Sequence, residues 1–341
     1  MKLFPDRWKL ERTRPLSVLL LLAVISWLTP LAAQAGLDPA QPIGQYIHQY
    51  WQTAQGLPQN SVLCLTQTPD GYLWLGTEEG LVRFDGVHFT LFDKNTAGLK
   101  SNMVLALLVD RHKDLWLGTY GGGIARLHEG KFESFTIQDG LPSNQVRALY
   151  EDPNGALWIG TDGGGLACLK DRKVRVYTRA DGLADNAVFA LAGDRAGAIW
   201  VGTHNGVSRF QDGKFASYSA RNGLSGAFVR ALYADNDGAM WVGTNDGLSR
   251  ISKSAISRFT VRDGLTSNTV SSITRDTAGT LWVGTANGLN RFADCKFNAF
   301  TEKDGLSGKD VLSLLEDREG NLWVGTGGGG LNVFKQEYFE G

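Results

Sequence analysis

The chain has 341 residues, and its 34 Lys and Arg residues nearly balance its 35 Asp and Glu residues, for a formal net charge of -1. This balance excludes nucleic-acid binding through a basic surface, which needs a clear excess of Lys and Arg. The 43 Gly residues recur at fixed places among hydrophobic residues, which is typical of many tight turns rather than of disorder. The three Cys residues stand at unrelated positions without Cys-x-x-Cys spacing, so the sequence predicts neither a disulfide framework nor a zinc site.

Residues 1–35 have the pattern of a secretory signal peptide. Five basic residues precede the apolar run Leu16–Leu28, and a small-residue cleavage pattern ends at Ala35. We expect cleavage after Ala35. The alternative is an uncleaved signal anchor, because the apolar stretch can be extended to about the shortest length that spans a bilayer. In both cases the rest of the chain leaves the cytoplasm. Residues 36–44, which contain two Pro and two Gly, are predicted to be a linker.

Over residues 45–341 one motif recurs seven times: a Trp, an aliphatic residue, Gly and Thr. Successive Trp residues are 41 or 42 positions apart, which is typical of one supersecondary unit repeated along a chain. We expect each Trp to pack between neighbouring units, because a buried Trp removes about 150–250 Å² from water. The seven residues are Trp74, Trp116, Trp158, Trp200, Trp241, Trp282 and Trp323.

The third unit shows how each copy should fold. Its β-prone segments alternate in hydrophobicity and are separated by Asp- and Gly-containing turns. The predicted strands are 146–150, 157–161, 166–169 and 173–179. Four short antiparallel strands in about 42 residues match one blade of a β-propeller. We therefore predict an all-β, seven-bladed β-propeller with four antiparallel strands per blade over 45–341. A parallel β-helix is the structural rival, but its coils are usually shorter.

The two ends of the chain predict how the ring closes. The seventh unit contains only three strands, whereas the segment from Tyr46 to Pro58 is similar to the fourth strand and exit loop of the other units. The N-terminal strand should therefore complete the last blade. A ring closed in this way leaves no free inner sheet edge.

Most other recurring residues have a structural explanation. Pairs such as Asp152 and Gly155 are typical of hairpin turns. A small residue such as Ala148 follows each first-strand Val by two places, which indicates a crowded sheet face. The oxygen-rich segment 235–238 lacks the further ligands of a calcium loop, and the Gly runs open no helix that could hold a phosphate. We predict no metal and no cofactor.

Residues that break the repeat are the candidates for function. The loops after each Gly-Thr and the loops before each first strand should emerge on one face of the ring. Arg147, Phe189 and Arg230 stand in the first strands where other units have Leu or Ser. The two Arg lie two blades apart, so they could share an anion near the mouth of the central channel; the alternative is that both form salt bridges with neighbours. The candidate ligand-binding residues are Tyr120, Arg147, Asp162, Phe189, His204, Arg230 and Asp246.

His204 is the basis of an alternative prediction, which is that the chain is an enzyme. A lyase mechanism would require His204 to pair with a carboxylate across the channel mouth, and Asp162 and Asp246 are the candidates. A lone loop His is more often solvated, so we assign no catalytic residue.

Residues 141–161 read Leu-Pro-Ser-Asn-Gln-Val-Arg-Ala-Leu-Tyr-Glu-Asp-Pro-Asn-Gly-Ala-Leu-Trp-Ile-Gly-Thr. This phrase closely resembles the two-component regulator propeller repeat, and the resemblance extends over residues 45–339. It implies a ligand-sensing extracytoplasmic region of a hybrid sensor kinase or diguanylate cyclase. Typical members of that family carry two such propellers, a small β-sandwich, a membrane helix and a cytoplasmic output domain. We expect no kinase or cyclase activity from residues 1–341, which contain no such output motif.

The sequence therefore predicts a periplasmic sensor propeller without a catalytic output domain. Its expected partners are a small molecule or oligosaccharide ligand and a signalling protein or a second copy of the chain, with membrane contact only through an uncleaved N-terminal segment. The alternatives are a propeller enzyme resembling a lyase or glycosidase, and a platform for protein–protein interaction.

Overall fold

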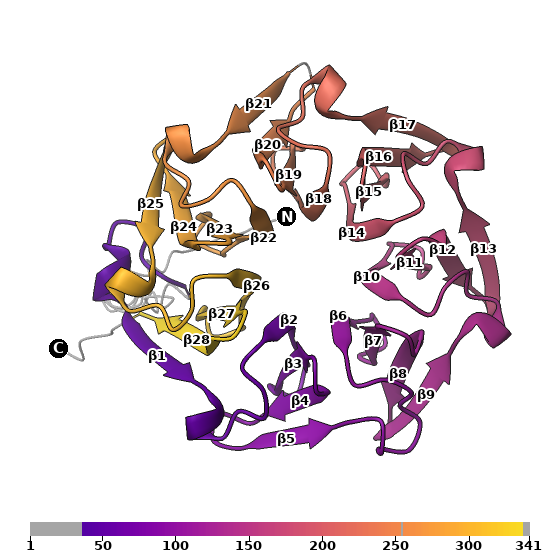
Figure 1. The fold of residues 1–341 in the computed structure, drawn as a ribbon, viewed down its shortest axis with the longest axis horizontal. Helices are drawn as coiled ribbons and strands as arrows, with labels where there is room; N and C mark the ends of the chain where they lie inside the picture. Colours follow the sequence, from indigo (N-terminus) through magenta and orange to yellow (C-terminus); the bar gives the residue numbers. More distant parts are fainter. Residues whose placement is uncertain (1–35, 254, 337–341) are drawn as a thin grey trace, which may run out of the picture. The chain divides into compact units, whose positions relative to one another are not determined.

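The computed structural model describes residues 36–253 and 255–336, so the predicted signal peptide over 1–35 lies outside the described residues. The segment that begins at Gly36 forms a ring of seven four-stranded antiparallel sheets around a central opening (Figure 1). The predicted all-β, seven-bladed propeller is confirmed. In the described part of the chain, no helix has the length and apolar character needed to cross a membrane.

Blades one to six take consecutive groups of four strands, beginning with β2–β5 and ending with β22–β25. The inner strands surround the channel: β2 (Val62–Gln67), β6 (Val104–Val109), β10 (Val146–Glu151), β14 (Val188–Gly193), β18 (Val229–Ala234), β22 (Val270–Arg275) and β26 (Val311–Glu316). The second strands carry the Trp phrase: β3 (Leu73–Thr77), β7 (Leu115–Thr119), β11 (Leu157–Thr161), β15 (Ile199–Thr203), β19 (Met240–Thr244), β23 (Leu281–Thr285) and β27 (Leu322–Thr326).

The third strands are β4 (Leu81–Phe84), β8 (Ile124–His128), β12 (Gly165–Lys170), β16 (Gly206–Gln211), β20 (Gly247–Ile251), β24 (Gly288–Ala293) and β28 (Gly330–Lys335). The outer strands are β5 (Phe89–Phe92), β9 (Lys131–Phe135), β13 (Lys173–Tyr177), β17 (Lys214–Tyr218), β21 (Ile256–Phe259), β25 (Lys296–Phe300) and, in blade seven, β1 (Ile47–Trp51). Single 3₁₀ turns precede β1 or follow outer strands: η2 (Ile43–Gln45), η3 (Thr53–Gln55), η4 (Ile137–Asp139), η5 (Arg179–Asp181), η6 (Ala220–Asn222), η7 (Val261–Asp263) and η8 (Glu302–Asp304).

Blade seven is closed by the N-terminal strand, as the sequence predicts. Strand β1 pairs with β28 from Ile47 opposite Lys335 to Trp51 opposite Leu331, and the sheet order is β1-β28-β27-β26. The indole of Trp51 stacks on that of Trp323, with ring centroids 5.7 Å apart. Two segments about 280 residues apart in sequence thus join the ends of the ring (Figure 1).

The seven repeated Trp residues lie between neighbouring blades, as predicted, and each is at most 8% exposed. Trp158 of blade three, for example, packs in one cluster with Val188 and Val201 of blade four. The indole N–H of Trp158 donates to Asp152, whose other oxygen accepts the backbone N–H groups of the hairpin turn. In six blades this Asp–Trp bond is present, and in blade one Trp74 donates to Thr68 instead.

The blades approach each other closely where the repeat has small residues. A Cβ placed on Gly160 would lie 2.6 Å from Val188 of the next blade and 3.2 Å from Ala148 of its own. Real Cβ atoms do not approach that closely, so the position requires Gly and leaves Ala148 no room to grow. The crowded face predicted from the small residues is confirmed.

Residues 36–44, predicted to be a linker, pack on the propeller. Leu37 and Ile43 are buried in one hydrophobic cluster with Trp282 and Phe334. Arg291 of β24 donates a hydrogen bond to the backbone oxygen of Gln41, at 2.6 Å. Because buried apolar side chains hold it in place, this segment is part of the propeller's packing rather than a free spacer.

Candidate functional site

Each inner strand begins with a β-bulge, and this feature creates the site. In blade three the pairing of β10 with β11 shifts between Val146 and Ala148, so that Arg147 falls outside the regular ladder. Bulges redirect a side chain and often lie next to functional sites. The seven bulged residues are Leu63, Leu105, Arg147, Phe189, Arg230, Ser271 and Leu312.

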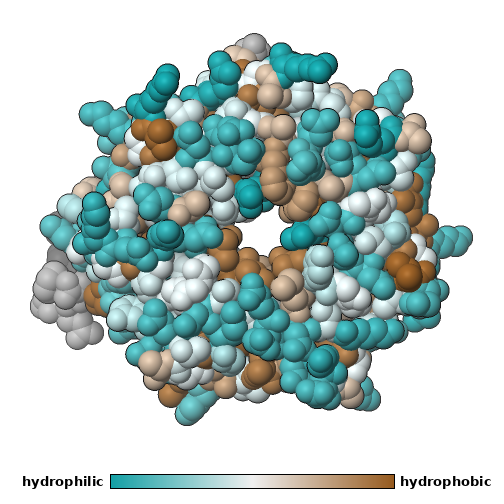
Figure 2. Space-filling model, viewed as in Figure 1, coloured by the Kyte–Doolittle hydropathy of each residue, from teal (hydrophilic) through white to brown (hydrophobic). Residues whose placement is uncertain are grey.

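All seven bulged residues line one cavity of about 220 Å³ at the central channel, together with Phe228. The rim of this cavity is asymmetric: blades seven, one and two contribute Leu, whereas blades three, four and five contribute Arg147, Phe189 and Arg230. Figure 2 shows the opening with hydrophobic atoms along its lower-left rim, beside β26 and β2, and hydrophilic atoms projecting into it from the right. The charged and aromatic side chains at the bulges are therefore concentrated on one side of the channel.

Arg147 is held between aromatic rings and a carboxylate. Its guanidinium carbon lies 5.5 Å from the ring centre of Tyr120 in blade two and 5.2 Å from that of Phe189 in blade four. Nε and Nη2 both donate to Asp162, at 3.1 and 2.9 Å. The predicted alternative of a salt bridge to a neighbour therefore holds for Arg147, although its side chain keeps 31% of its surface exposed.

Arg230 has a different environment. Its guanidinium carbon lies 4.5 Å from the ring centre of Phe228, and no described carboxylate forms an ion pair with it. A guanidinium stacked on a ring keeps its in-plane N–H donors free, and these match a planar anion such as carboxylate. The salt-bridge alternative does not hold for Arg230.

Asp310, which immediately precedes β26, does not line the cavity but carries a carboxyl that interacts electrostatically with Arg230. Burial raises the pKa of the Asp310 carboxyl, and the positive charge of Arg230 opposes that rise. An anion bound at Arg230 would therefore be repelled by Asp310 when that carboxyl is ionised.

The structure brings six of the seven predicted site residues into one chain of contacts. Tyr120 and Asp162 contact Arg147, which faces Phe189; the ring of Phe189 lies 4.6 Å from that of Phe228, and Phe228 also contacts Arg230 and His204. Asp246 stands apart from this chain, beside Gly226 in blade five.

His204 has no acidic partner among the residues described. Its ring lies 5.1 Å from that of Phe228, while Asp162 is engaged by Arg147 and Asp246 lies against Gly226. The pairing that the lyase alternative requires is not present. Within the described ranges, no three His, Cys, Asp or Glu side chains converge as metal ligands.

Phe228 lines the cavity and Asp310 interacts electrostatically with Arg230, but neither residue was predicted from the sequence. Both occupy the position just before the first-strand Val, where the other units have Ser61, Met103, Gln145, Ala187 and Thr269. A comparison of that position across the seven units would have shown one aromatic and one acidic residue. The bulge that turns this part of the strand toward the channel has no signature in the sequence.

The sequence pattern of the two-component regulator propeller family matches seven segments: 56–79, 98–121, 140–163, 182–205, 223–246, 264–287 and 305–328. The repeat occurs in every blade of the seven-bladed propeller, and the chain therefore belongs to the two-component regulator propeller family. No protein of curated function matches it.

Two similar solved structures are extracellular domains of hybrid two-component systems from B. thetaiotaomicron. The chain is 25% identical to the BT3049 domain with a TM-score of 0.76, over 85% of this chain and 41% of that one. For the BT4673 domain the values are 24%, 0.71, 86% and 40%. The chain thus spans about two fifths of the length of these relatives.

A third similar structure is virginiamycin B lyase from Staphylococcus aureus, with 16% identity, a TM-score of 0.70, and coverage of 86% of this chain and 100% of that one. This likeness shows the propeller fold alone, because the same fold carries many unrelated functions.

Proposed function

We propose that this chain is an extracytoplasmic sensor propeller that binds a small molecule, or the end of an oligosaccharide, through an anionic group at the mouth of its central channel. The observation that carries the proposal is Arg230, a guanidinium on the cavity rim that forms no ion pair with any carboxylate in the described part of the chain. Arg147, which is ion-paired with Asp162, lines the same cavity, and Leu63, Leu105 and Leu312 offer apolar contact for the rest of the ligand.

The size of the cavity limits what enters it. Small-molecule pockets usually measure about 300–1,000 Å³, so a cavity of 220 Å³ suits a carboxylate- or sulfate-bearing group rather than a whole oligosaccharide. The remaining part of a larger ligand would lie on the loops that carry Tyr120 and His204.

Family membership and the similarity to extracellular sensor domains support the sensing role. We propose that the propeller acts in the periplasm after cleavage at Ala35 and has no catalytic activity of its own. N-terminal sequencing of the secreted protein would test the cleavage: a chain that begins at Gly36 supports it, and a chain that retains residues 1–35 contradicts it.

A thermal-shift screen tests the ligand class. We expect mono- and dicarboxylates, uronic acids or sulfated sugars to raise the melting temperature of the mature protein, and their uncharged amides and neutral sugars not to do so. A ligand at 100 times its Kd should add about 2.7 kcal/mol to the free energy of unfolding. Equal stabilisation by the charged and uncharged members of each pair would contradict an anion site.

A further inference from the structure

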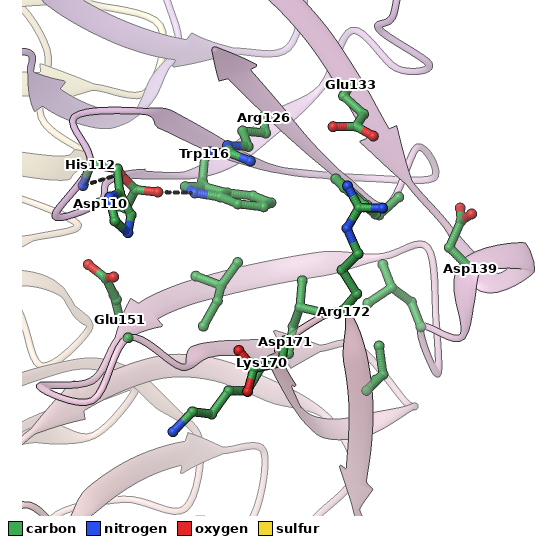
Figure 3. Close-up of a pocket in the computed structure, with 16 residues that line it drawn as sticks. Asp110, His112, Trp116, Arg126, Glu133, Asp139, Glu151, Lys170, Asp171 and Arg172 are labelled. Atoms are coloured by element: carbon green, nitrogen blue, oxygen red, sulfur yellow. Dashed lines mark hydrogen bonds between the residues drawn. The ribbon is translucent and has the colours of Figure 1, made fainter.

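A second cavity lies between blades two and three, away from the residues of the channel rim. It measures about 500 Å³, within the usual range for small-molecule sites. Figure 3 shows its main side chains, with Trp116 on one wall, Glu133 and Asp139 on the opposite side, and Arg172 between them. The hydrophobic surface of the groove comes from Trp116, Phe135, Leu141, Leu157, Leu169 and Val174.

The groove is open because blade three lacks two aromatic residues found in other blades. In blade four, Phe210 and Phe215 pack together with ring centroids 4.8 Å apart, and Phe210 lies 5.5 Å from the Trp158 ring of the preceding blade. Blade six repeats this arrangement with Phe292 and Phe297. At the equivalent positions blade three has Leu169 and Val174, which are paired across β12 and β13. The space beside Trp116 is therefore left unfilled.

Blade three also departs from its neighbours in the turn that ends at this groove. The hairpin between β12 and β13 places Arg172 at φ +61°, where blades two and four have Gly130 and Gly213 at φ +77° and +78°. A left-handed conformation is unfavourable for a residue with a side chain, and such strain is often kept at functional sites. Figure 3 shows the Arg172 side chain extending into the groove, and no ion pair engages it among the described residues.

Charges of both signs converge around the hydrophobic wall. Arg172 supplies an unpaired guanidinium, and Glu133 supplies an exposed carboxylate for which no partner is present in the described ranges. Hydrogen bonds from the backbone and hydroxyl of Thr136 lower the pKa of Asp139, which keeps that carboxylate charged beside the groove. Arg126 is neutralised by Asp114 and lies over the Trp116 ring, 5.5 Å from its centre.

We propose that this groove binds a free amino acid with a hydrophobic side chain. The carboxylate of the ligand would accept hydrogen bonds from Arg172, its ammonium group would donate to Glu133 in the field of Asp139, and its side chain would occupy the space beside Trp116, Leu169 and Val174. A zwitterion satisfies Arg172 and Glu133 at once, which neither an anion nor a cation does. This site is separate from the channel mouth and does not rest on the function proposed there.

Isothermal titration calorimetry with L-phenylalanine, leucine and tryptophan tests the proposal, with N-acetylphenylalanine and phenylalaninamide as probes that each lack one charge. We expect at least one of the three amino acids to bind with a Kd of about 1 mM or tighter, and each one-charge analogue to bind about tenfold more weakly. No binding of any of the three at millimolar concentration, or equal binding of the analogues, would overturn it.

Two variants probe the site without removing a residue that the fold requires. Arg172→Gly restores the turn residue of the neighbouring blades, and the double variant Leu169→Phe with Val174→Phe restores the side chains of blades four and six. We expect both variants to fold and to bind at least about tenfold more weakly. The matched control is Cys295→Gly, which makes the same backbone change at φ +60° in blade six and should leave binding unchanged. Wild-type affinity in Arg172→Gly would overturn the assignment.

Discussion

Blades three to five and blades seven, one and two present the same bulged backbone to the channel but different chemistry. The bulged residues are Arg147, Phe189 and Arg230 on one side, and three Leu residues on the other. The Trp and Gly positions behind the bulges scarcely vary, because they decide how closely the blades pack. Every blade thus has the bulge, whereas the side chain at the bulge is free to vary. The blades that have a charged or aromatic residue there are adjacent.

Deleting residues 44–54 should have the largest effect on stability, because it removes the strand that closes the ring on which both sides of the channel depend. The deletion takes away β1, its ladder with β28, and the contact of Trp51 with Trp323. We expect loss of the cooperative unfolding transition in circular dichroism. A truncated protein that melts like the full-length protein would contradict closure by β1.

Trp241→Ala should come next, since this indole is 2% exposed between blades five and six and donates to Asp235. Replacing a buried Trp by Ala costs about 3–5 kcal/mol of unfolding free energy. Urea denaturation would measure the loss. Arg230→Ala is the control: it lies on the rim and should change stability by less than about 0.5 kcal/mol. Equal losses in both variants would remove the distinction between packing and rim positions.

Ala148→Leu should have an intermediate effect. Ala148 follows the bulge and faces Gly160 and Val188, so a larger side chain overpacks this face and costs about 1–3 kcal/mol. Its neighbour on the rim gives the comparison: Leu105→Ala in blade two should cost less, because Leu105 lines the open cavity. The same urea measurement applies, and a larger loss in Leu105→Ala would contradict the assignment of the two faces.

The smallest effect concerns Asp310. Because burial raises its pKa in the folded protein, the neutral carboxyl stabilises the fold at low pH, and this contribution is lost as the pH rises through the raised pKa. Ionised Asp310 would also compete with an anion for Arg230. We expect ligand affinity to fall as the pH rises through the raised pKa of Asp310, and Asp310→Asn to bind several-fold more tightly at neutral pH. Calorimetry at several pH values would show this, and weaker binding by Asp310→Asn would be contrary to it.

The sequence predicted more of the fold than of the site, for physical reasons. The spacing of the Trp residues and the unmatched strand near Tyr46 were sufficient for seven blades and their closure, because both are local patterns repeated along the chain. The site depends on a one-residue shift in pairing next to Arg147, which arises only when β10 packs against β11 and its neighbours. Asp152 was interpreted only as a turn residue, since nothing in the sequence shows that the indole of Trp158 returns to it.

On the proposed function, Arg230 provides the anion-binding group at the channel mouth. The most direct measurement is the Kd of the best anionic ligand from the screen, by calorimetry, for the wild type, Arg230→Ala and Arg258→Ala. Arg258 lies exposed on β21, the outer strand of the same blade, so its replacement makes the same change in charge away from the channel. We expect Arg230→Ala to weaken binding by at least about tenfold and Arg258→Ala to leave it unchanged. Unchanged affinity in Arg230→Ala, or an equal loss in both variants, would contradict the account.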